Sequence, residues 1–135
     1  MADRRTFLKT SAVAVSALAL SRSGSAIASD DDKYSGIVYT KENAGQWAKK
    51  VGSHAPVVTV EGDTVTVETK HGMSEAHFIV RHTLVLDNGT VVGGKAFTPR
   101  DKPVSTYTIP AGYKGELYAT SFCNLHDFWL TEVKV

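Results

Sequence analysis

The stretch VVTVEGDTVTVE, residues 57–68, consists of two β-branched runs on either side of Glu61-Gly62-Asp63. Valine alternates with threonine in the second run, and this alternation is typical of a strand with one buried face. The Gly-Asp pair between the runs is a turn signal. The stretch therefore predicts two neighbouring β-strands.

The chain continues in the same manner toward its C-terminus. His77–Leu86 predicts a longer strand that ends at Asp87-Asn88-Gly89, a strong hairpin turn, and Thr90–Phe97 can return beside it. Further strands are expected over Val104–Ile109, Gly115–Phe122 and Phe128–Val135. One helical turn around Asn43–Lys50 would carry Trp47. About seven short strands without a long amphipathic helix predict an all-β fold, an immunoglobulin-like antiparallel β-sandwich, with a small barrel as the alternative.

The N-terminus predicts an export signal. The RRTFLK sequence at residues 4–9 resembles a twin-arginine signal; an apolar run of about eleven residues follows from Thr10, and small residues end at Ala28. We expect cleavage after Ala28 and export of the folded protein to a bacterial periplasm or another extracytoplasmic space. The expected organisation is a signal peptide at 1–28, a polar segment at 29–44 and one domain at 45–135.

The charge balance excludes two classes of partner. Residues 1–28 hold four basic residues and one acidic residue, so the rest of the chain has 11 basic and 13 acidic residues, a net charge of −2. A nucleic-acid-binding domain needs a clustered basic face, and an anionic membrane surface also favours basic residues. We therefore expect no nucleic acid and no stable membrane anchor after cleavage.

The only cysteine, Cys123, has no partner in the chain for a disulfide. In an oxidising compartment a free thiol is open to oxidation unless it is deeply buried or bound to a metal. His126 follows it in a Cys-x-x-His pair, which alone is a weak signal because such spacings occur by chance.

Four of the five histidines are expected in loops or at strand ends, where functional groups concentrate: His54, His71, His77 and His126. His82 is expected on the same strand as His77, five residues further on, and so on the opposite face. A closed zinc site needs four ligands and usually more cysteines. Four imidazoles and one thiolate suit a five-coordinate redox metal such as iron.

Three blocks of the sequence resemble the iron site of the superoxide reductases, the neelaredoxin and desulfoferrodoxin group. They are HAP at 54–56, HGMSEAHFI at 71–79 and CNLH at 123–126. The flanking stretches KGELYATSF at 114–122 and DFW at 127–129 resemble the C-terminal block of the same family. The resemblance covers about residues 45–135.

This resemblance implies a single non-haem iron on an immunoglobulin-like sandwich. His54, His71, His77 and His126 would be the equatorial ligands and Cys123 the axial ligand, with the remaining iron position open for superoxide. The implied reaction is the one-electron reduction of superoxide to hydrogen peroxide. No further cysteines are present for the rubredoxin-like domain of two-iron members. The resemblance therefore implies a one-iron form with a separate electron donor, rubredoxin-like or a cytochrome.

Two positions depart from the family pattern. Glutamate and lysine typically precede the first histidine, but this chain has Gly52 and Ser53 there. The sixth ligand of the oxidised iron therefore stays unidentified, with Glu42 as a distant candidate for the carboxylate, and Lys49 and Lys50 are the candidates for attracting superoxide. Without the family's lysine, the alternative function is an exported, non-enzymatic iron protein, either an electron carrier or a sensor of small ligands. The sequence also leaves open whether the protein forms a homo-oligomer.

Overall fold

The computed structural model describes Tyr34 and residues 36–135, and the following account concerns residues 36–135. The expected export signal and the boundary after Ala28 lie outside the described residues. Within the described part, no helix has the length and apolar composition needed to cross a bilayer.

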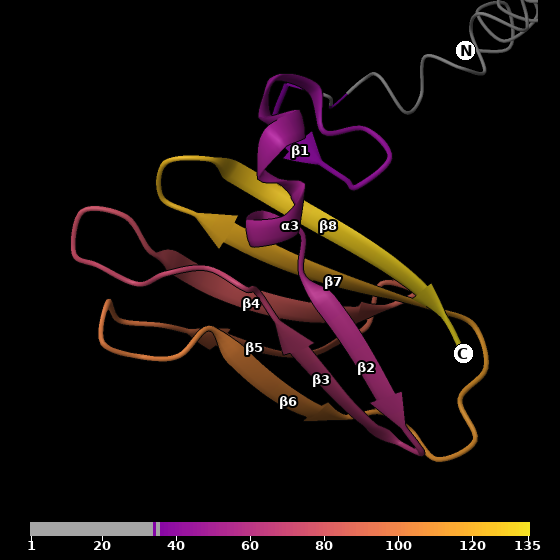
Figure 1. Cartoon of the computed structure of the whole chain (residues 1–135). Helices are drawn as coiled ribbons and strands as arrows, with labels where there is room; N and C mark the ends of the chain where they lie inside the picture. The colour runs from indigo at the N-terminus through magenta and orange to yellow at the C-terminus, as the bar shows by residue number, and fades with distance from the viewer. Residues whose placement is uncertain (1–33, 35) are drawn as a thin grey trace, which may run out of the picture. The chain divides into compact units, whose positions relative to one another are not determined.

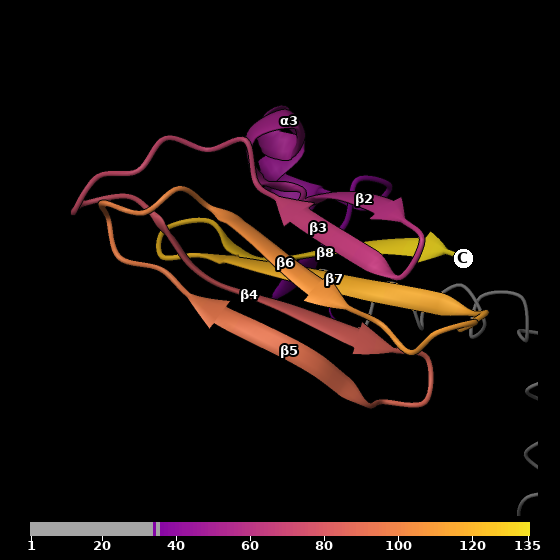
Figure 2. The ribbon, with the colours of Figure 1, turned by 90° about the horizontal axis from the view of Figure 1, so that it is seen from below.

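Eight strands form two sheets, which confirms the predicted all-β sandwich (Figure 1). The five-stranded sheet has the order β1-β8-β7-β4-β5, and the three-stranded sheet has the order β2-β3-β6. Figure 2 shows the two sheets from a second direction. The strands are β1 (Val38–Tyr39), β2 (Val57–Glu61), β3 (Thr64–Glu68), β4 (Ile79–Leu86), β5 (Val91–Ala96), β6 (Val104–Thr108), β7 (Glu116–Cys123) and β8 (Asp127–Lys134).

The predicted strands are present, with differences at their ends. The quoted stretch forms β2 and β3, which pair antiparallel around the Gly62 turn, where Gly62 has φ 62°. A positive φ is a conformation that glycine adopts without steric cost. β1 has no counterpart in the prediction; it is a two-residue strand that pairs parallel with the start of β8.

The sheets pack through apolar side chains that alternate along each strand. The main cluster contains Val65 and Val67 of β3, Leu84 of β4 and Leu117 of β7, all at most 1% exposed. Each fully buried side chain of this size contributes roughly 1.5–3 kcal/mol relative to an exposed one. The core thus fixes the strands that carry the loops at one end of the sandwich.

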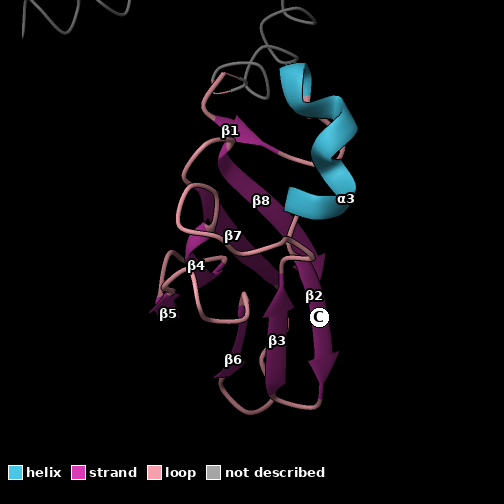
Figure 3. Ribbon diagram, turned by 60° about the vertical axis from the view of Figure 1, so that its left-hand side comes forward, coloured by secondary structure: helices cyan, strands magenta, loops and turns pink. Residues whose placement is uncertain are grey.

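The helical segment lies beside β1 and β8 (Figure 3). A 3-10 helix, η1 (Gly45–Lys50), continues into one α-helical turn, α3 (Val51–His54). Tyr39, Ala44 and Trp129 form a buried cluster against which Trp47 and Val51 pack. This cluster anchors the helical segment to the edge of the five-stranded sheet.

β4 begins two residues later than the sequence predicts, because His77 lies in the connection before the strand. The prediction that His77 and His82 lie on one strand is therefore wrong, because only His82 belongs to β4. The register of β4 against β7 also shifts between Ile79 and Arg81. This β-bulge lets both Ile79 and His82 face the interior, where both are 0% exposed.

Candidate metal centre

The five residues of the expected ligand set come from three connections at one end of the sandwich. His54 is the last residue of α3, and His71 and His77 lie between β3 and β4. Cys123 is the last residue of β7, and His126 lies in the turn between β7 and β8. Figure 1 shows these connections at the same end, away from the C-terminus.

The β7–β8 turn is a tight structure that holds two of these residues. Cys123 pairs with Asp127 at the end of the ladder, and Asp127 has φ 68°, in the left-handed region. Non-glycine residues adopt this conformation rarely, and asparagine and aspartate do so most easily. The turn thus returns the chain within three residues, and His126 lies close to the cysteine.

Asn124 joins this turn to the loop that carries His77. Its Oδ1 accepts a hydrogen bond from the Phe78 N–H at 3.0 Å, and its Nδ2 donates to the Ala76 carbonyl at 3.1 Å. The Asn124 N–H also donates to the Phe78 carbonyl at 3.2 Å. These bonds fix the His77 loop against the Cys123–His126 turn, although the two segments are about 46 residues apart.

The ring nitrogens of the four histidines follow one another at short distances. His71 Nε2 is 3.0 Å from His77 Nε2, which is 3.0 Å from His126 Nδ1. His126 Nδ1 is in turn 3.1 Å from His54 Nε2. His54 and His71 pack edge to face, with ring centroids 4.6 Å apart, and this contact closes the circle.

The thiol of Cys123 joins the same group. Its Sγ is 3.6 Å from His126 Nδ1. The ligand atoms of His54, His77, Cys123 and His126 all lie within 4.8 Å of one another. The fifth residue, His71, contacts the group through His77 and His54. The structure therefore brings together all five residues that the sequence proposed as ligands, and His82 is not among them.

Lowered pKa values favour the neutral form of three histidines in this group, His54, His71 and His126. The pKa of His54 is lowered from 6.5 to about 4, first by burial and then by the neighbouring His71 and His126 rings. Burial and the His77 ring lower the pKa of His71, and burial followed by the Lys50 charge lowers that of His126. A neutral imidazole has a free lone pair, which is the form that binds a metal.

The outer nitrogen of His54 has the partners that a metal-binding histidine usually has. Its Nδ1 is 2.8 Å from Ser53 Oγ and 3.2 Å from the Lys50 carbonyl oxygen. If Nδ1 donates its proton there, Nε2 presents a lone pair toward the other rings. Such outer hydrogen bonds fix the tautomer and the ring orientation of metal-bound histidines.

Two tryptophans hold His126 from outside. Trp129 Nε1 donates to the His126 carbonyl at 2.9 Å. Trp47 packs edge to face on the His126 ring at 4.7 Å between centroids, and its Nε1 donates to Asp127 Oδ2 at 3.1 Å. The sequence pointed to Trp47 only as part of a helical turn, and no local pattern pairs it with Asp127.

These residues fit a bound metal ion. Where two of these ring nitrogens face each other at about 3 Å, only one of them can donate a hydrogen to the other, so the second must present its lone pair. A cation among the rings would accept the inward lone pairs of all four imidazoles. Four imidazoles and a thiol are borderline and soft donors, a set that suits iron, and they exceed the four ligands of a closed zinc site.

A hollow of about 460 Å³ opens above the histidines and gives a small ligand access to them. Its lining consists of Lys50, Ser53, His54, His71, Gly72, Met73, Ser74 and His77. Of the two lysines that the sequence proposed for steering, Lys50 lines this hollow and Lys49 does not. Lys50 also lowers the pKa values of His71 and His126, so its charge acts on the centre.

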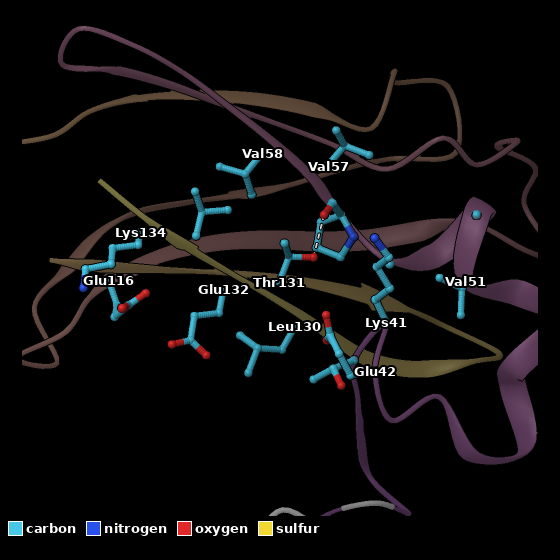
Figure 4. A pocket seen from close by; sticks show the side chains of 15 residues that line it. Lys41, Glu42, Val51, Val57, Val58, Glu116, Leu130, Thr131, Glu132 and Lys134 are labelled. Carbon is cyan, nitrogen blue, oxygen red and sulfur yellow. Dashed lines mark hydrogen bonds between the residues drawn. The ribbon is translucent and has the colours of Figure 1, made fainter.

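A larger groove of about 720 Å³ lies elsewhere, between α3, β2 and the later part of β8 (Figure 4). Glu42, which the sequence offered as a distant candidate for an iron carboxylate, lines this groove together with Lys41 and Gly52. It does not line the hollow above the histidines. None of the five grouped residues lines the groove, so its size does not mark the metal centre.

Known proteins resemble this chain in both sequence and structure. The desulfoferrodoxin family model matches residues 44–132. A superoxide reductase of Pyrococcus abyssi is 33% identical over 109 residues, covering 68% of this chain and 93% of the relative. A desulfoferrodoxin of Syntrophotalea carbinolica is 32% identical over 98 residues, covering 67% of this chain and 69% of the relative.

Among solved structures, a variant of the superoxide reductase (neelaredoxin) from Ignicoccus hospitalis superposes with a TM-score of 0.68. It is 28% identical, and the match covers 76% of this chain and 95% of that structure. The family model, the relatives and the solved structure point to the same family. The chain belongs to the desulfoferrodoxin family.

Proposed function

We propose that this protein is a superoxide reductase, an enzyme that reduces superoxide by one electron to hydrogen peroxide. One superoxide, one electron and two protons give one hydrogen peroxide, and no dioxygen is released. The observation that carries the proposal is the convergence of four imidazoles and one thiol at one end of the sandwich. Superoxide reductases are also the relatives that this chain resembles over most of their length.

The proposed metal ligands are His54, His71, His77, His126 and Cys123, and the proposed metal is one iron per chain. Iron bound there would supply the electron by changing between its ferrous and ferric states. The short distances between neighbouring donor atoms support this ligand set. The bonds of Asn124, Trp47 and Trp129 described above would keep the donors in place.

Cys123 is the one sulfur donor among the five residues. It is 1% exposed, about as deeply buried as His54 at 2%. A cysteine bound as thiolate pushes electron density toward the metal, as cysteine does in some haem enzymes. The role proposed for Cys123 is therefore to tune the metal, while the four histidines hold it.

Lys50 is the proposed electrostatic guide for the superoxide anion. It lines the hollow above the histidines, whereas Lys49 is exposed and lies outside that lining. One charge a few ångströms from a solvated site is worth about 1 kcal/mol, or roughly tenfold or less in the rate of capture. The lysine that typically precedes the first histidine is thus replaced in part by a residue one helical turn earlier.

The reaction also requires a separate one-electron donor, and we propose a rubredoxin-like protein or a cytochrome. We further propose that the twin-arginine sequence at residues 4–9 directs the folded protein to the periplasm or another extracytoplasmic space. Fusion of residues 1–28 to a reporter tests this: export should be lost when Arg4 and Arg5 are both changed to lysine. Export that survives this change would contradict the proposed route.

Rapid mixing of the ferrous protein with superoxide tests the function. We expect one hydrogen peroxide for each superoxide consumed, oxidation of the iron and no dioxygen above the uncatalysed background. The alternative, a non-enzymatic electron carrier or sensor, rests on Gly52 and Ser53 at the positions where glutamate and lysine are typical. An iron-loaded protein that does not accelerate superoxide consumption would contradict the enzyme and favour that alternative.

A further inference from the structure

His82 lies fully buried between the two sheets, and both of its ring nitrogens are hydrogen-bonded. Its Nε2 is 2.8 Å from Thr69 Oγ1, and its Nδ1 is 2.8 Å from Ser105 Oγ. Thr69 Oγ1 is also 2.7 Å from Ser121 Oγ. These four residues, called here the His82 network, are each at most 3% exposed.

The network crosses from one sheet to the other. His82 and Ser121 face each other in register on β4 and β7 of the five-stranded sheet. Ser105 belongs to β6 of the three-stranded sheet, and Thr69 follows the end of β3 in the same sheet. The ring of Phe97 packs edge to face against His82 at 4.8 Å. The polar groups are thus enclosed between the sheets, where each unmatched group would cost about 1–3 kcal/mol.

A neutral imidazole suits this position because it has one donor and one acceptor. The hydroxyl groups can orient in either direction along the chain of bonds, so every member has a partner. Burial, followed by the Lys95 charge, lowers the pKa of His82 to about 4, which keeps the ring neutral near pH 7. The bonds of the network are therefore stable over the ordinary pH range.

Two members of the His82 network, Thr69 and Ser121, lie two residues before the proposed ligands His71 and Cys123. The His71 N–H donates to the Thr69 carbonyl at 2.8 Å, and the Thr69 N–H donates to the Pro103 carbonyl at 3.0 Å. Ser121 lies on β7 two residues before Cys123. The His71 segment follows a strand of the three-stranded sheet, and Cys123 ends a strand of the five-stranded sheet. Thr69 and Ser121 are hydrogen-bonded to each other just before these two segments separate.

We propose that His82 is a positioning residue for the metal centre. Through Thr69 it holds the His71 segment at a fixed distance from the Cys123 segment, and thereby slows release of the metal. The role rests on the proposed function only in taking His71 and Cys123 as iron ligands; it does not require that superoxide be the substrate. His82 itself touches neither the metal ligands nor the hollow above them.

The test compares the holoprotein with His82→Leu, which removes both bonds, and His82→Gln, which keeps a donor and an acceptor. Leu84→Ala is the control, since Leu84 is 0% exposed on the same strand but belongs to the apolar cluster. The first readout is the rate at which excess chelator removes iron, compared under conditions in which the proteins have the same free energy of unfolding. The second readout is the electron paramagnetic resonance spectrum of the oxidised protein.

We expect iron release to be about tenfold faster in His82→Leu, the lower end of the range for direct outer partners of metal ligands, because His82 acts through Thr69. The ferric spectrum should change, His82→Gln should restore both properties in part, and Leu84→Ala should stay close to wild type. Equal release rates and spectra in His82→Leu and Leu84→Ala would overturn the proposal.

If His82→Leu does not fold, Thr69→Val removes the central hydroxyl at nearly constant volume and is judged by the same outcomes. Neither readout involves superoxide, so the two proposals fail separately. If the variants release iron at the relative rates expected above but the protein does not reduce superoxide, the proposed enzyme activity is refuted and the role of His82 stands.

Discussion

The four histidines at the loop end and His82 in the core differ in the groups that their ring nitrogens face. At the loop end, ring nitrogens face other ring nitrogens and a thiol at 3.0–3.6 Å. In the core, both nitrogens of His82 meet hydroxyl groups at 2.8 Å. Burial does not separate the groups, because His54 is 2% exposed and His82 is 0% exposed. Lowered pKa values do not separate them either, since both residues have pKa values of about 4.

The difference shows how a metal-binding histidine can be told from a structural one. Hydroxyl groups donate as well as accept, so the His82 network is complete without any further component. The imidazoles at the loop end converge on one another and on a thiol, and a cation among them would give every inward-facing lone pair a partner. Convergence of ring nitrogens and a thiol, and not burial or pKa, is therefore the observation that supports the proposed ligand set.

The largest expected effect comes from making the same substitution in each group. In His77→Gln the iron content should fall well below one per chain, because an amide is a much poorer ligand than an imidazole for this metal. In His82→Gln the iron content should stay near one per chain, even if release is faster. Metal analysis of both variants after loading under identical conditions measures this. Equal losses would mean that the two groups are wrongly divided.

An intermediate effect is expected on the stability of the metal-free protein at low pH. The pKa of His82 is about 4 in the folded protein and 6.5 ordinarily, so between these values the unfolded chain binds a proton that the folded protein excludes. The free energy of unfolding should therefore fall as pH decreases from 6.5 to 4, by about 3 kcal/mol from this residue.

Chemical denaturation of the metal-free wild type and His82→Gln at several pH values measures this contribution. His54 acts in the same direction and is present in both proteins, so the difference between the two pH profiles belongs to position 82. The variant should lose less stability on acidification than the wild type. Parallel profiles would show that His82 is protonated in the folded protein or is not buried.

The smallest expected effect concerns the two lysines next to the loop-end histidines. Lys50→Ala should slow superoxide capture by roughly tenfold or less and flatten its dependence on salt, because Lys50 lines the hollow. Lys49→Ala, the matched control on the adjacent residue, should leave both nearly unchanged. Second-order rates measured against ionic strength decide this. Identical salt slopes in wild type and Lys50→Ala would exclude steering by Lys50.

The fold could be predicted largely from local chemistry. β-branched alternation and the turns at Gly62 and Gly89 gave the strands and their antiparallel order. The start of β4 was misplaced because residues 77–86 read as one continuous run. The His77 N–H and carbonyl instead bond to Ser74, and Asn124 holds Phe78, so the chain pairs only from Ile79 onward. β1 was missed because two residues are too short to show a pattern.

The grouped donors were also predictable, since the spacing of the histidines and the cysteine is visible in the chain. The contacts that hold these donors in place could not be predicted from the sequence. Trp47 and Asp127 are 80 positions apart, and Thr69 and Ser121 are 52 apart. No periodicity connects such pairs, and only the packing of the two sheets brings them together. Likewise, the sequence could not separate Lys49 from Lys50, because the orientation of η1 decides which one reaches the hollow.

The central claim is that four histidines and Cys123 bind one iron, and X-ray absorption at the iron edge of the oxidised protein tests it most directly. We predict one sulfur and several nitrogen scatterers around iron at one equivalent per chain, with a thiolate-to-iron absorption band in the visible range. In Cys123→Ser the sulfur scatterer and the band should both disappear. Stoichiometric zinc in place of iron, or iron without a sulfur neighbour in the wild type, would contradict the account.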